Sequence, residues 1–387
     1  MDQKLNLSEK MSEWRRHLHR NPELSGNEVE TSRFIAETLE TFGLKPKLSV
    51  EGRCVTVDLE GLNPAKKIAF RADCDALPIL ERSGDEFASA VPGVMHACGH
   101  DAHTATQIGL AALLSEQKPS TNVRLIFQPA EETLQGAKEV IAAGLVDDLD
   151  AIFGLHFVPN CQTGEILVEP GVVMASADSF DISITGQASH AARPQEGKDS
   201  IVCAARIVES VQTIVSREIA PSDLGLISIC KLEAGNSRNI IAESAVLSGT
   251  IRAHDKEIRK KLKSRFKETV KSTASSLGMS AEIEFVSSSP PLENHSVLSK
   301  FAVQQAKAAK GVEKVLESAP PSMGAEDFAY YSENIPGCYV KVGSRIADYP
   351  YYPLHSDRYR LNEKAMDIAL AYLLKVAENA DNLSITK

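Results

Sequence analysis

The chain has 387 residues, of which 43% are hydrophobic and 24% are charged, and its formal net charge is −10. A chain of this length suits two globular domains, each able to bury an apolar core. The acidic balance and the lack of a dense lysine and arginine run argue against nucleic acid and anionic membranes as partners. No stretch approaches the ~20 apolar residues of a membrane span, and the N-terminus lacks the apolar core of a signal peptide. The seven cysteines show no paired framework, which indicates a reducing compartment, so we expect a cytoplasmic protein.

Strand-like apolar runs alternate with helical patterns over the first part of the chain. Two of the helical patterns are followed by Gly43 and Gly144, and glycine at that position is the usual end of a helix. The alternation predicts an α/β sandwich with a mostly parallel central sheet. We expect strands at residues 54–59, 67–71, 123–128, 151–157 and 165–168, and helices at 31–42, 102–115 and 136–143.

A different pattern follows between residues 178 and 291. Strand-like and helix-like segments come in the order βαββαβ, the split βαβ arrangement of a small ferredoxin-like domain. This segment is an insertion, because a candidate metal ligand, His355, lies beyond it. We therefore predict a discontinuous catalytic domain at 1–177 and 292–387 and an inserted domain at 178–291. The inserted elements are expected at 179–185, 199–217, 225–232, 245–253, 255–276 and 281–286, and the first domain resumes with 297–309, 338–342 and 363–378.

Residues of the types that bind metal ions stand where a parallel sheet would expose the carboxyl ends of its strands. A cysteine and a histidine lie two apart before the helix expected at 102–115, and the glycine between them allows a tight bend. Alone, this pair could equally be a packing cysteine and a satisfied core histidine. A catalytic zinc uses three protein ligands, so five suit two metals that share a ligand and a water. The candidate ligands are Cys98, His100, Glu132, His156 and His355, with two divalent ions per chain, Mn or Zn foremost and Co or Ni as alternatives.

One carboxylate, Glu131, is left over beside this set. As neighbours on an extended segment, Glu131 and Glu132 are expected to point to opposite sides, so that one binds metal while the other faces the substrate. Glu131 is then the general base, and later the general acid, of a metal-assisted hydrolase. A solvated loop glutamate is the alternative interpretation. Asp101, near the start of the following helix, either caps the helix or orients a ligand without binding metal.

Six strings in the chain resemble a known family. They resemble the aminoacylase/carboxypeptidase clan of two-metal metallopeptidases, and within it the amidohydrolase branch of N-acyl-amino-acid, hippurate and auxin-conjugate hydrolases. The strings occur in the same order along the chain as in the family, and the match covers nearly the whole chain. The strings are WRRHLHRNPEL (14–24), FRADCDALP (70–78), HACGHDAH (96–103), QPAEE (128–132), SHAARP (189–194) and GAEDF (324–328).

The resemblance implies a bimetal site on a catalytic domain with an inserted lid. It gives the Cys98 thiolate the bridging place that an aspartate holds in other branches. Arg71 stands where those branches have a metal-binding histidine, and arginine has no free lone pair with which to bind metal. Asp73 would then orient a ligand instead of binding metal itself.

Three residues of the inserted segment take roles from the same resemblance. His190 would cross a dimer interface and donate a hydrogen bond to the oxyanion in the partner's site, which implies a homodimer through the inserted domain. Asn239 and Arg252 resemble a substrate-binding pair, with the guanidinium binding the α-carboxylate of an acylated amino acid. A surface histidine and a lid salt bridge are the alternatives for His190 and Arg252.

These features predict an enzyme that hydrolyses the amide bond of small N-acyl amino acids. A dipeptidase with the same mechanism is the nearest alternative. A cysteine hydrolase using Cys98 as nucleophile is less favoured, because metal-type donors crowd that thiol. A binding protein without turnover is disfavoured by the presence of both Glu131 and the ligand set.

Overall fold

The computed structural model describes residues 2–384 and divides into two compact units. Met1, part of the N-terminal segment considered above, lies outside the described residues. The first unit holds the residues up to Gly171, the segment Glu293–Pro320 and the residues from Glu326 on, and the second holds Val172–Leu292 and Pro321–Ala325. The segment Pro321–Ala325 thus belongs to the second unit, although its sequence position suggested the first.

The first unit is built on one eight-stranded sheet with the strand order β1-β2-β4-β3-β5-β16-β6-β15. The four central strands β4, β3, β5 and β16 run parallel. The pairs β1–β2, β2–β4 and β6–β16 are antiparallel, whereas the edge strand β15 pairs parallel with β6. This confirms the expected α/β fold with a mostly parallel sheet. The strands are β1 (Lys47–Ser49), β2 (Cys54–Leu59), β3 (Asn63–Asp73), β4 (Thr121–Gln128), β5 (Ala151–Gln162), β6 (Glu165–Leu167), β15 (Lys314–Leu316) and β16 (Gly337–Arg345).

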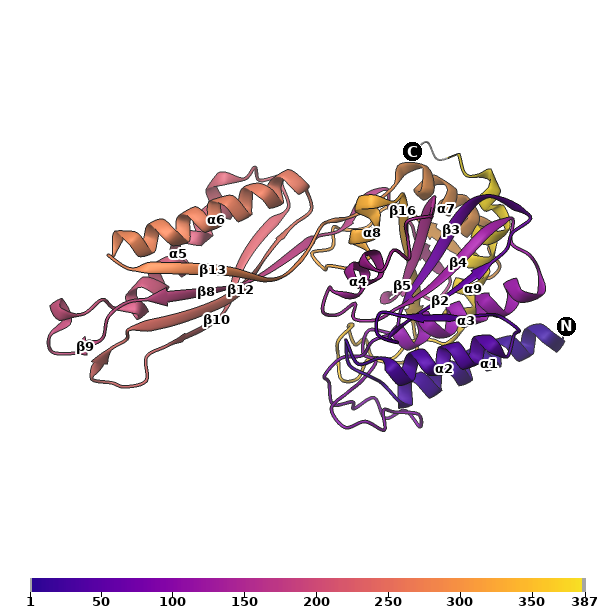
Figure 1. Ribbon diagram of the computed structural model, residues 1–387, viewed down its shortest axis with the longest axis horizontal. Coiled ribbons are helices and arrows are strands. Elements are labelled where there is room, and N and C mark those ends of the chain that lie inside the picture. The colour runs from indigo at the N-terminus through magenta and orange to yellow at the C-terminus, as the bar shows by residue number, and fades with distance from the viewer. Residues whose placement is uncertain (1, 385–387) are drawn as a thin grey trace. The chain divides into compact units, whose positions relative to one another are not determined.

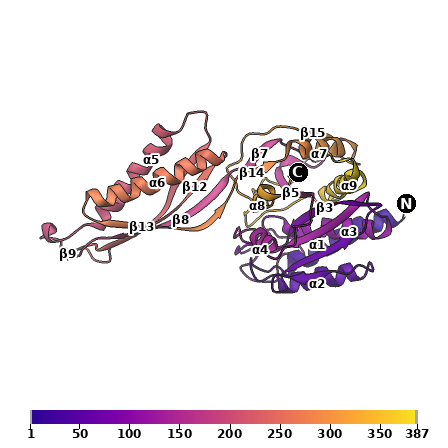
Figure 2. The ribbon, with the colours of Figure 1, turned by 45° about the horizontal axis from the view of Figure 1, so that its top comes forward.

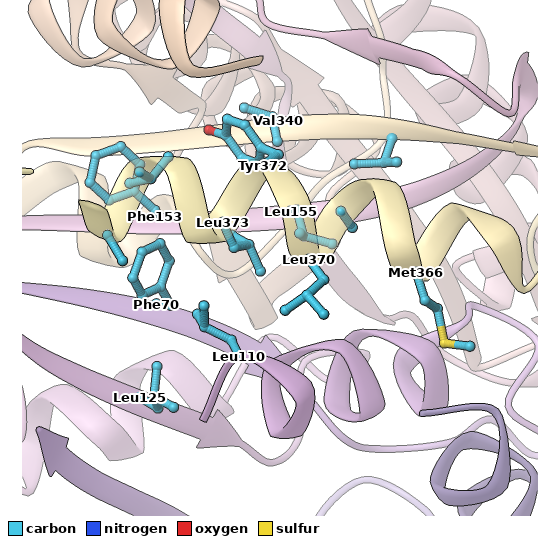
Figure 3. Close-up of a cluster of buried hydrophobic side chains, with 14 of the residues drawn as sticks. Phe70, Leu110, Leu125, Phe153, Leu155, Val340, Met366, Leu370, Tyr372 and Leu373 are labelled. Atoms are coloured by element: carbon cyan, nitrogen blue, oxygen red, sulfur yellow. The ribbon is translucent and has the colours of Figure 1, made fainter. Parts of the chain in front are cut away.

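Helices pack on this sheet and enclose the larger hydrophobic core. Figure 3 shows side chains of the sheet, such as Phe70 and Phe153, meeting Leu110 of α3 and Leu370 and Leu373 of α9. Burial of such a cluster is the main favourable term in folding. The helices are α1 (Asp2–Arg20), α2 (Val29–Glu40), α3 (His100–Glu116), α4 (Gly136–Ala142), α7 (Ser296–Ala308), α8 (Ala329–Asn334) and α9 (Lys364–Asn379), with a final 3-10 turn η2 (Ala380–Asn382).

Two glycines end helices of this unit as the sequence predicts. Gly43 follows α2 with φ 74°, and Gly144 follows α4 with φ 69°, both in the left-handed region that glycine adopts without strain. The helix α1 was not expected, because its segment was interpreted only as a family signature.

The second unit is a four-stranded antiparallel sheet in the order β10-β12-β8-β13, with α5 and α6 on one face (Figures 1 and 2). This is the expected ferredoxin-like arrangement. Asp199 and Asp255 cap the two helices, accepting hydrogen bonds from backbone N–H groups of the first turns at 2.9 and 2.8 Å. The elements are β8 (Ser176–Thr185), β9 (Ser189–His190), η1 (Pro194–Glu196), α5 (Ser200–Glu218), β10 (Gly225–Ala234), β11 (Ile240–Ile241), β12 (Ser244–Ala253), α6 (Lys256–Ser276) and β13 (Ser280–Ser289).

Short strands β7 (Gly171–Met174) and β14 (Leu292–Asn294) lie where the chain passes from one unit to the other. Within residues 2–384, no helix combines the length and the apolar character that crossing a bilayer requires.

Candidate metal centre

Parallel strands of the first unit end at one edge of the sheet and bring polar residues together there. Strand β3 ends at Asp73, and the neighbouring strand β4 ends at Gln128, directly before the turn that carries Glu131 and Glu132. His156 lies on β5, which pairs with β3 on its other side. The carboxyl ends of parallel strands are where α/β sheets bind ligands.

The remaining candidate ligands are held at this edge by unusual backbone conformations. Gly99, between Cys98 and His100, has φ 88°, and a Cβ there would lie 2.9 Å from a tyrosine hydroxyl, so the bend before α3 requires glycine. His355 also has a positive φ, 65°, and its backbone N–H donates to the carbonyl oxygen of Ala97 at 2.9 Å. This bond fixes the late segment of the chain beside the segment that carries Cys98.

All five predicted ligands are brought together, in two overlapping groups. The potential ligand atoms of Cys98, His100 and His156 lie within 4.8 Å of one another, and so do those of Cys98, Glu132 and His355. Cys98 Sγ is 3.3 Å from His156 Nε2, and Glu132 Oε1 is 3.3 Å from His355 Nε2. Cys98 is therefore the residue common to both groups.

The donor set fits divalent cations. His100 Nε2 and Glu132 Oε1 are buried and have no hydrogen-bond partner among the described residues, although such groups are nearly always paired in folded proteins. Burial, together with the Glu132 carboxylate, raises the pKa of the Cys98 thiol well above its usual value. A bound cation would displace that proton and coordinate both of these atoms.

The prediction that Glu131 and Glu132 point to opposite sides is wrong. Oxygen atoms of both carboxylates and a ring nitrogen of His100 lie within 4.8 Å of one another. The reason lies in the backbone: Ala130 has φ 54°, and residues 131–134 form a turn closed by the Leu134 N–H to Glu131 carbonyl bond at 2.7 Å. The alternation of an extended strand does not apply to a turn.

Glu131 is nevertheless distinct from Glu132 in its surroundings. Its side chain is buried, and its Oε1 accepts a hydrogen bond from the backbone N–H of Asp327 at 3.3 Å. Burial raises the pKa of Glu131 well above its usual value, and the carboxylates of Glu326, Glu132 and Asp327 raise it further. A carboxyl group with a raised pKa is suited to taking and returning a proton.

Asp75, which sequence analysis did not single out, orients one of the candidate ligands. Its Oδ1 lies 3.1 Å from His100 Nδ1, while its Oδ2 accepts hydrogen bonds from Ser25 Oγ at 2.7 Å and from the Glu132 backbone N–H at 3.0 Å. With Nδ1 donating to Asp75, the Nε2 atom of His100 is left with its lone pair free to bind metal. A usable signal was its spacing, two residues after Asp73 at a strand end, which suggests the same side of the chain.

Asp73 lies at the expected place beside the candidate ligands. Its carboxylate is 2.5 Å from His103 Nδ1, 2.6 Å from Arg71 Nη1 and 3.7 Å from His100 Nε2. The other ring nitrogen of His103 accepts the backbone N–H of Phe157 at 3.0 Å. Asp73 and His103 thereby connect the end of β3 with β5 at Phe157.

Asp101 requires a correction. It was expected to cap the helix or to orient a ligand, but α3 begins after Gly99 without a side-chain cap. Its Oδ2 instead binds Arg15 Nε at 3.0 Å and His19 Nδ1 at 2.9 Å, both on α1. Among the described residues, no hydrogen bond joins it to the five candidate ligands. Two buried cations on α1 attract it, and a pattern within its own helix cannot reveal them.

Arg71 lies at the centre of a buried network that sequence analysis missed. Its guanidinium donates to Gln128 Oε1 at 2.8 Å, Glu326 Oε1 at 3.0 Å and Asp327 Oδ1 at 2.6 Å. Burial raises the pKa of Asp327 to about 8, against the opposing effect of Arg71. Glu326 also accepts a hydrogen bond from the hydroxyl of Tyr339 at 2.5 Å. The GAEDF motif was the available signal, but without coordinates it indicated only a family likeness.

The candidate residues of the second unit are less constrained. His190 is exposed on β9, and its Nδ1 accepts the backbone N–H of Ala192 at 3.1 Å. The amide oxygen of Asn239 accepts a serine hydroxyl at 2.7 Å. Arg252 donates to the backbone carbonyl oxygen of Met323 at 3.1 Å, which ties β12 to the segment Pro321–Ala325. The salt bridge considered for Arg252 is not among the contacts of the described residues.

Residues 69–379 match the model of the Peptidase family M20/M25/M40. The chain belongs to this family. It is 38% identical to the N-acetyl-L-cysteine deacetylase of Bacillus subtilis (strain 168), over 94% of this chain and 86% of that protein. It is 36% identical to IAA-amino acid hydrolase ILR1-like 4 of Arabidopsis thaliana, over 96% and 88%.

A solved structure of the same family supports this assignment. The YXEP protein of Bacillus subtilis, a dinuclear metal binding peptidase from the M20 family, matches with a TM-score of 0.83 and 34% identity, over 97% of this chain and 98% of that one. The family resemblance expected from the sequence motifs is thus confirmed.

Proposed function

We propose that this M20 family member is a metal-dependent amidohydrolase that cleaves the amide bond of N-acyl amino acids, releasing an amino acid and a carboxylic acid. Family membership supports a metal-dependent hydrolase of amides. The names of two relatives, a deacetylase and an IAA-amino acid hydrolase, describe enzymes that act on substrates of this class. The observation that carries the proposal is a single buried thiol shared by two groups of metal-type donors, with a free carboxylate beside them.

Two divalent cations would be held by the two overlapping groups. Cys98, His100 and His156 would hold one cation, and Cys98, Glu132 and His355 the other, with the thiolate bridging. When bound, such ions polarise a carbonyl oxygen and lower the pKa of a water molecule. The thiolate and imidazole donors favour Zn²⁺, the Glu132 carboxylate also suits Mn²⁺, and Co²⁺ or Ni²⁺ are further candidates.

Glu131 would carry the proton of the reaction. Its carboxylate takes a proton from the attacking water and then gives it to the leaving amine, a role worth roughly 10²- to 10⁴-fold in rate. The hydrogen bond from the Asp327 backbone N–H holds this carboxylate in place without neutralising it. Asp75 keeps the tautomer of His100 that leaves its Nε2 free.

Residues of the second unit would recognise the rest of the substrate. One N–H group of the Arg252 guanidinium donates to the Met323 carbonyl oxygen, and the guanidinium has further N–H groups. A guanidinium can bind a carboxylate with two parallel hydrogen bonds. With Asn239 it would bind the α-carboxylate of the substrate. His190, whose side chain is exposed, would donate a hydrogen bond to the oxyanion in the site of a partner subunit.

We also propose a cytoplasmic homodimer that pairs through the second unit. The uncovered face and edges of its four-stranded sheet support pairing with a second copy. The free state of all seven cysteines within the described residues supports a reducing compartment.

A substrate panel tests the proposed reaction. The chelator-treated protein is supplied with Mn²⁺, Zn²⁺, Co²⁺ or Ni²⁺ and assayed on N-acetyl amino acids, on aromatic N-acyl amino acids and on dipeptides. We expect activity that chelation abolishes and metal restores, with kcat/KM at least ~10-fold higher on N-acyl amino acids than on dipeptides, because a pocket for an acyl group disfavours a charged amine. Higher kcat/KM on dipeptides would make the protein a dipeptidase. Activity that is indifferent to chelators but abolished by alkylation would replace the proposal with a cysteine hydrolase.

A further inference from the structure

The loop between α1 and α2, residues 23–28, contacts the surroundings of the metal centre although it contributes no candidate ligand. Its first two residues, Glu23 and Leu24, are the last two of the signature WRRHLHRNPEL, to which the proposed reaction gives no role. Leu24 forms a parallel bridge with Ala76, and the backbone N–H of Ala76 donates to the carbonyl oxygen of Glu23 at 2.8 Å. This loop therefore lies along the segment that carries Asp75.

Glu28 stands at the N-cap of α2 but does not cap that helix. Glu23 does so instead, since its Oε2 accepts the backbone N–H of Thr31 at 2.7 Å. The fully buried carboxylate of Glu28 accepts the backbone N–H of Ala130 at 2.7 Å and that of Gly26 at 2.9 Å. A residue at the start of one helix thus holds the backbone of a distant turn.

That turn is the one that presents Glu131 and Glu132. Ala130 has φ 54°, a conformation that costs energy in a residue with a Cβ and persists only where the surroundings hold it. Its N–H is buried, and a buried N–H without an acceptor is strongly disfavoured. Glu28 supplies that acceptor, so the direction of both carboxylates depends on it.

Ser25 acts on the same centre through Asp75. Its hydroxyl donates to Asp75 Oδ2 at 2.7 Å, on the same oxygen that accepts the Glu132 N–H, while the other oxygen faces His100 Nδ1. Asp75 is buried, so its carboxylate has only these few donors to fix its rotamer. Removing one of them loosens the carboxylate that orients a ligand.

We propose that residues 23–28 are a positioning element for the metal centre. Ser25 sets the Asp75 carboxylate and thereby His100, and Glu28 sets the turn after β4. Neither residue touches metal or substrate. The inference rests on the proposed function, because it concerns the same metal centre.

Calorimetry with Mn²⁺ on the chelator-treated full-length protein tests the role of Ser25 without substrate. Outer residues that orient metal ligands typically change metal affinity by 10- to 100-fold, so Ser25→Ala should weaken binding of at least one of two Mn²⁺ ions by ~10-fold or more. Ser32→Ala is the matched control, because its buried hydroxyl donates to the Arg53 carbonyl oxygen at 2.7 Å, away from the candidate ligands. Thermal unfolding of both variants checks that the fold is kept.

Two variants of Glu28 test the second contact. Glu28→Ala removes the acceptor, and we expect kcat at saturating Mn²⁺ to fall ~10-fold or more, since small misplacements of a catalytic group reduce rates steeply. Glu28→Gln keeps an acceptor oxygen and should restore most of kcat.

The outcomes separate this inference from the proposed function. A wild-type protein that does not bind two Mn²⁺ ions contradicts both. A wild-type protein that binds two, with equal affinities in the two serine variants, overturns the role of Ser25 alone. Equal kcat in the two Glu28 variants likewise overturns the role of Glu28.

Discussion

The two units hold their candidate functional residues in opposite ways. In the first, Arg71 binds Asp327 and Glu28 binds Ala130, partners that are far apart in sequence and buried together. In the second, His190 and Asn239 are exposed and bind residues two positions away. A buried hydrogen-bond network fixes polar groups in place before a ligand binds, and such fixed groups stabilise a transition state well. Exposed loop residues, by contrast, reach their final positions only when a substrate or partner binds. The comparison predicts that metal binding and proton transfer depend on the first unit, and that recognition of the substrate and of its oxyanion depends on the second.

Replacing the proposed base should have the largest effect. Glu131→Ala should reduce kcat by ~10² or more while two metal ions per chain remain, because proton transfer is lost and the ligands are kept. Metal analysis alongside kinetics checks this result. Glu132→Ala is the counterpart and should lower the metal content. The reverse pattern, with metal lost only from Glu131→Ala, would exchange the two roles.

Complementation between inactive chains tests whether the second unit serves a partner. His190→Ala should lower kcat by ~10²- to 10³-fold, the usual effect of removing an oxyanion donor. Mixing His190→Ala with Glu131→Ala chains should then regenerate activity, since a mixed dimer holds one site with Glu131 from one chain and His190 from the other. Absence of recovery despite demonstrated subunit exchange would assign His190 to its own chain or outside catalysis.

Thiol labelling compares the two units directly. Alkylation of Cys98 should be at least ~10-fold slower with metal bound than after chelation, because a thiolate that bridges two cations has its reactive lone pairs occupied. Cys230, exposed on β10, is the internal control and should react at the same rate in both states. Mass spectrometry of the labelled peptides gives both rates. A Cys98 rate unaffected by chelation would remove this residue from the metal centre.

A further expected effect concerns the stability of the first unit and not its reaction. Burial alone would lower the pKa of His19, but hydrogen bonds to Asp101 and Glu81 outweigh it and raise the pKa to about 9 from an ordinary value of 6.5. Because the pKa of His19 is higher in the folded than in the unfolded state, its protonation stabilises the fold. This contribution is fully present below pH 6.5 and is lost as the pH rises through about 9. The stabilisation is of the order of 3 kcal/mol.

Denaturant unfolding of the wild-type protein and of His19→Gln measures this contribution. Trp14 is the single tryptophan and packs against Phe42 in the first unit, so its fluorescence follows that unit alone. The difference in unfolding free energy between the two proteins should shrink between pH 6.5 and pH 9.5. A difference that is constant over this range would show that His19 is neutral in the fold.

Sequence patterns located the sheet and the ligands because both follow general rules. The strand β2 has the predicted bounds, Cys54–Leu59, and the donors meet because parallel strands end at one edge. The helix α1 was missed although Leu7, Met11, Trp14 and Leu18 recur at helical spacing, because its segment was interpreted only as a family signature. The directions of Glu131 and Glu132 depend on the left-handed conformation of Ala130, which alanine rarely adopts and no local pattern signals.

The contact roles of acidic residues were the least predictable part. Asp101 directly follows the candidate ligand His100, whereas Asp75 lies far from every candidate ligand in sequence, yet of these two only Asp75 hydrogen bonds to one of them. The side chains that contact each acid decide which of the two orients a ligand. Ser25 contacts Asp75, and Arg15 contacts Asp101. These partners come from the N-terminal segment, whose placement depends on packing.

The order of the ligands along the chain has a consequence for biosynthesis. Cys98 and His156 precede the second unit, whereas His355 follows it and joins them through the hydrogen bond to Ala97. During translation the last ligand leaves the ribosome only after the whole second unit. A chain truncated before His355 therefore lacks one of the five ligands, and the metal centre can be completed only after the second unit has been synthesised.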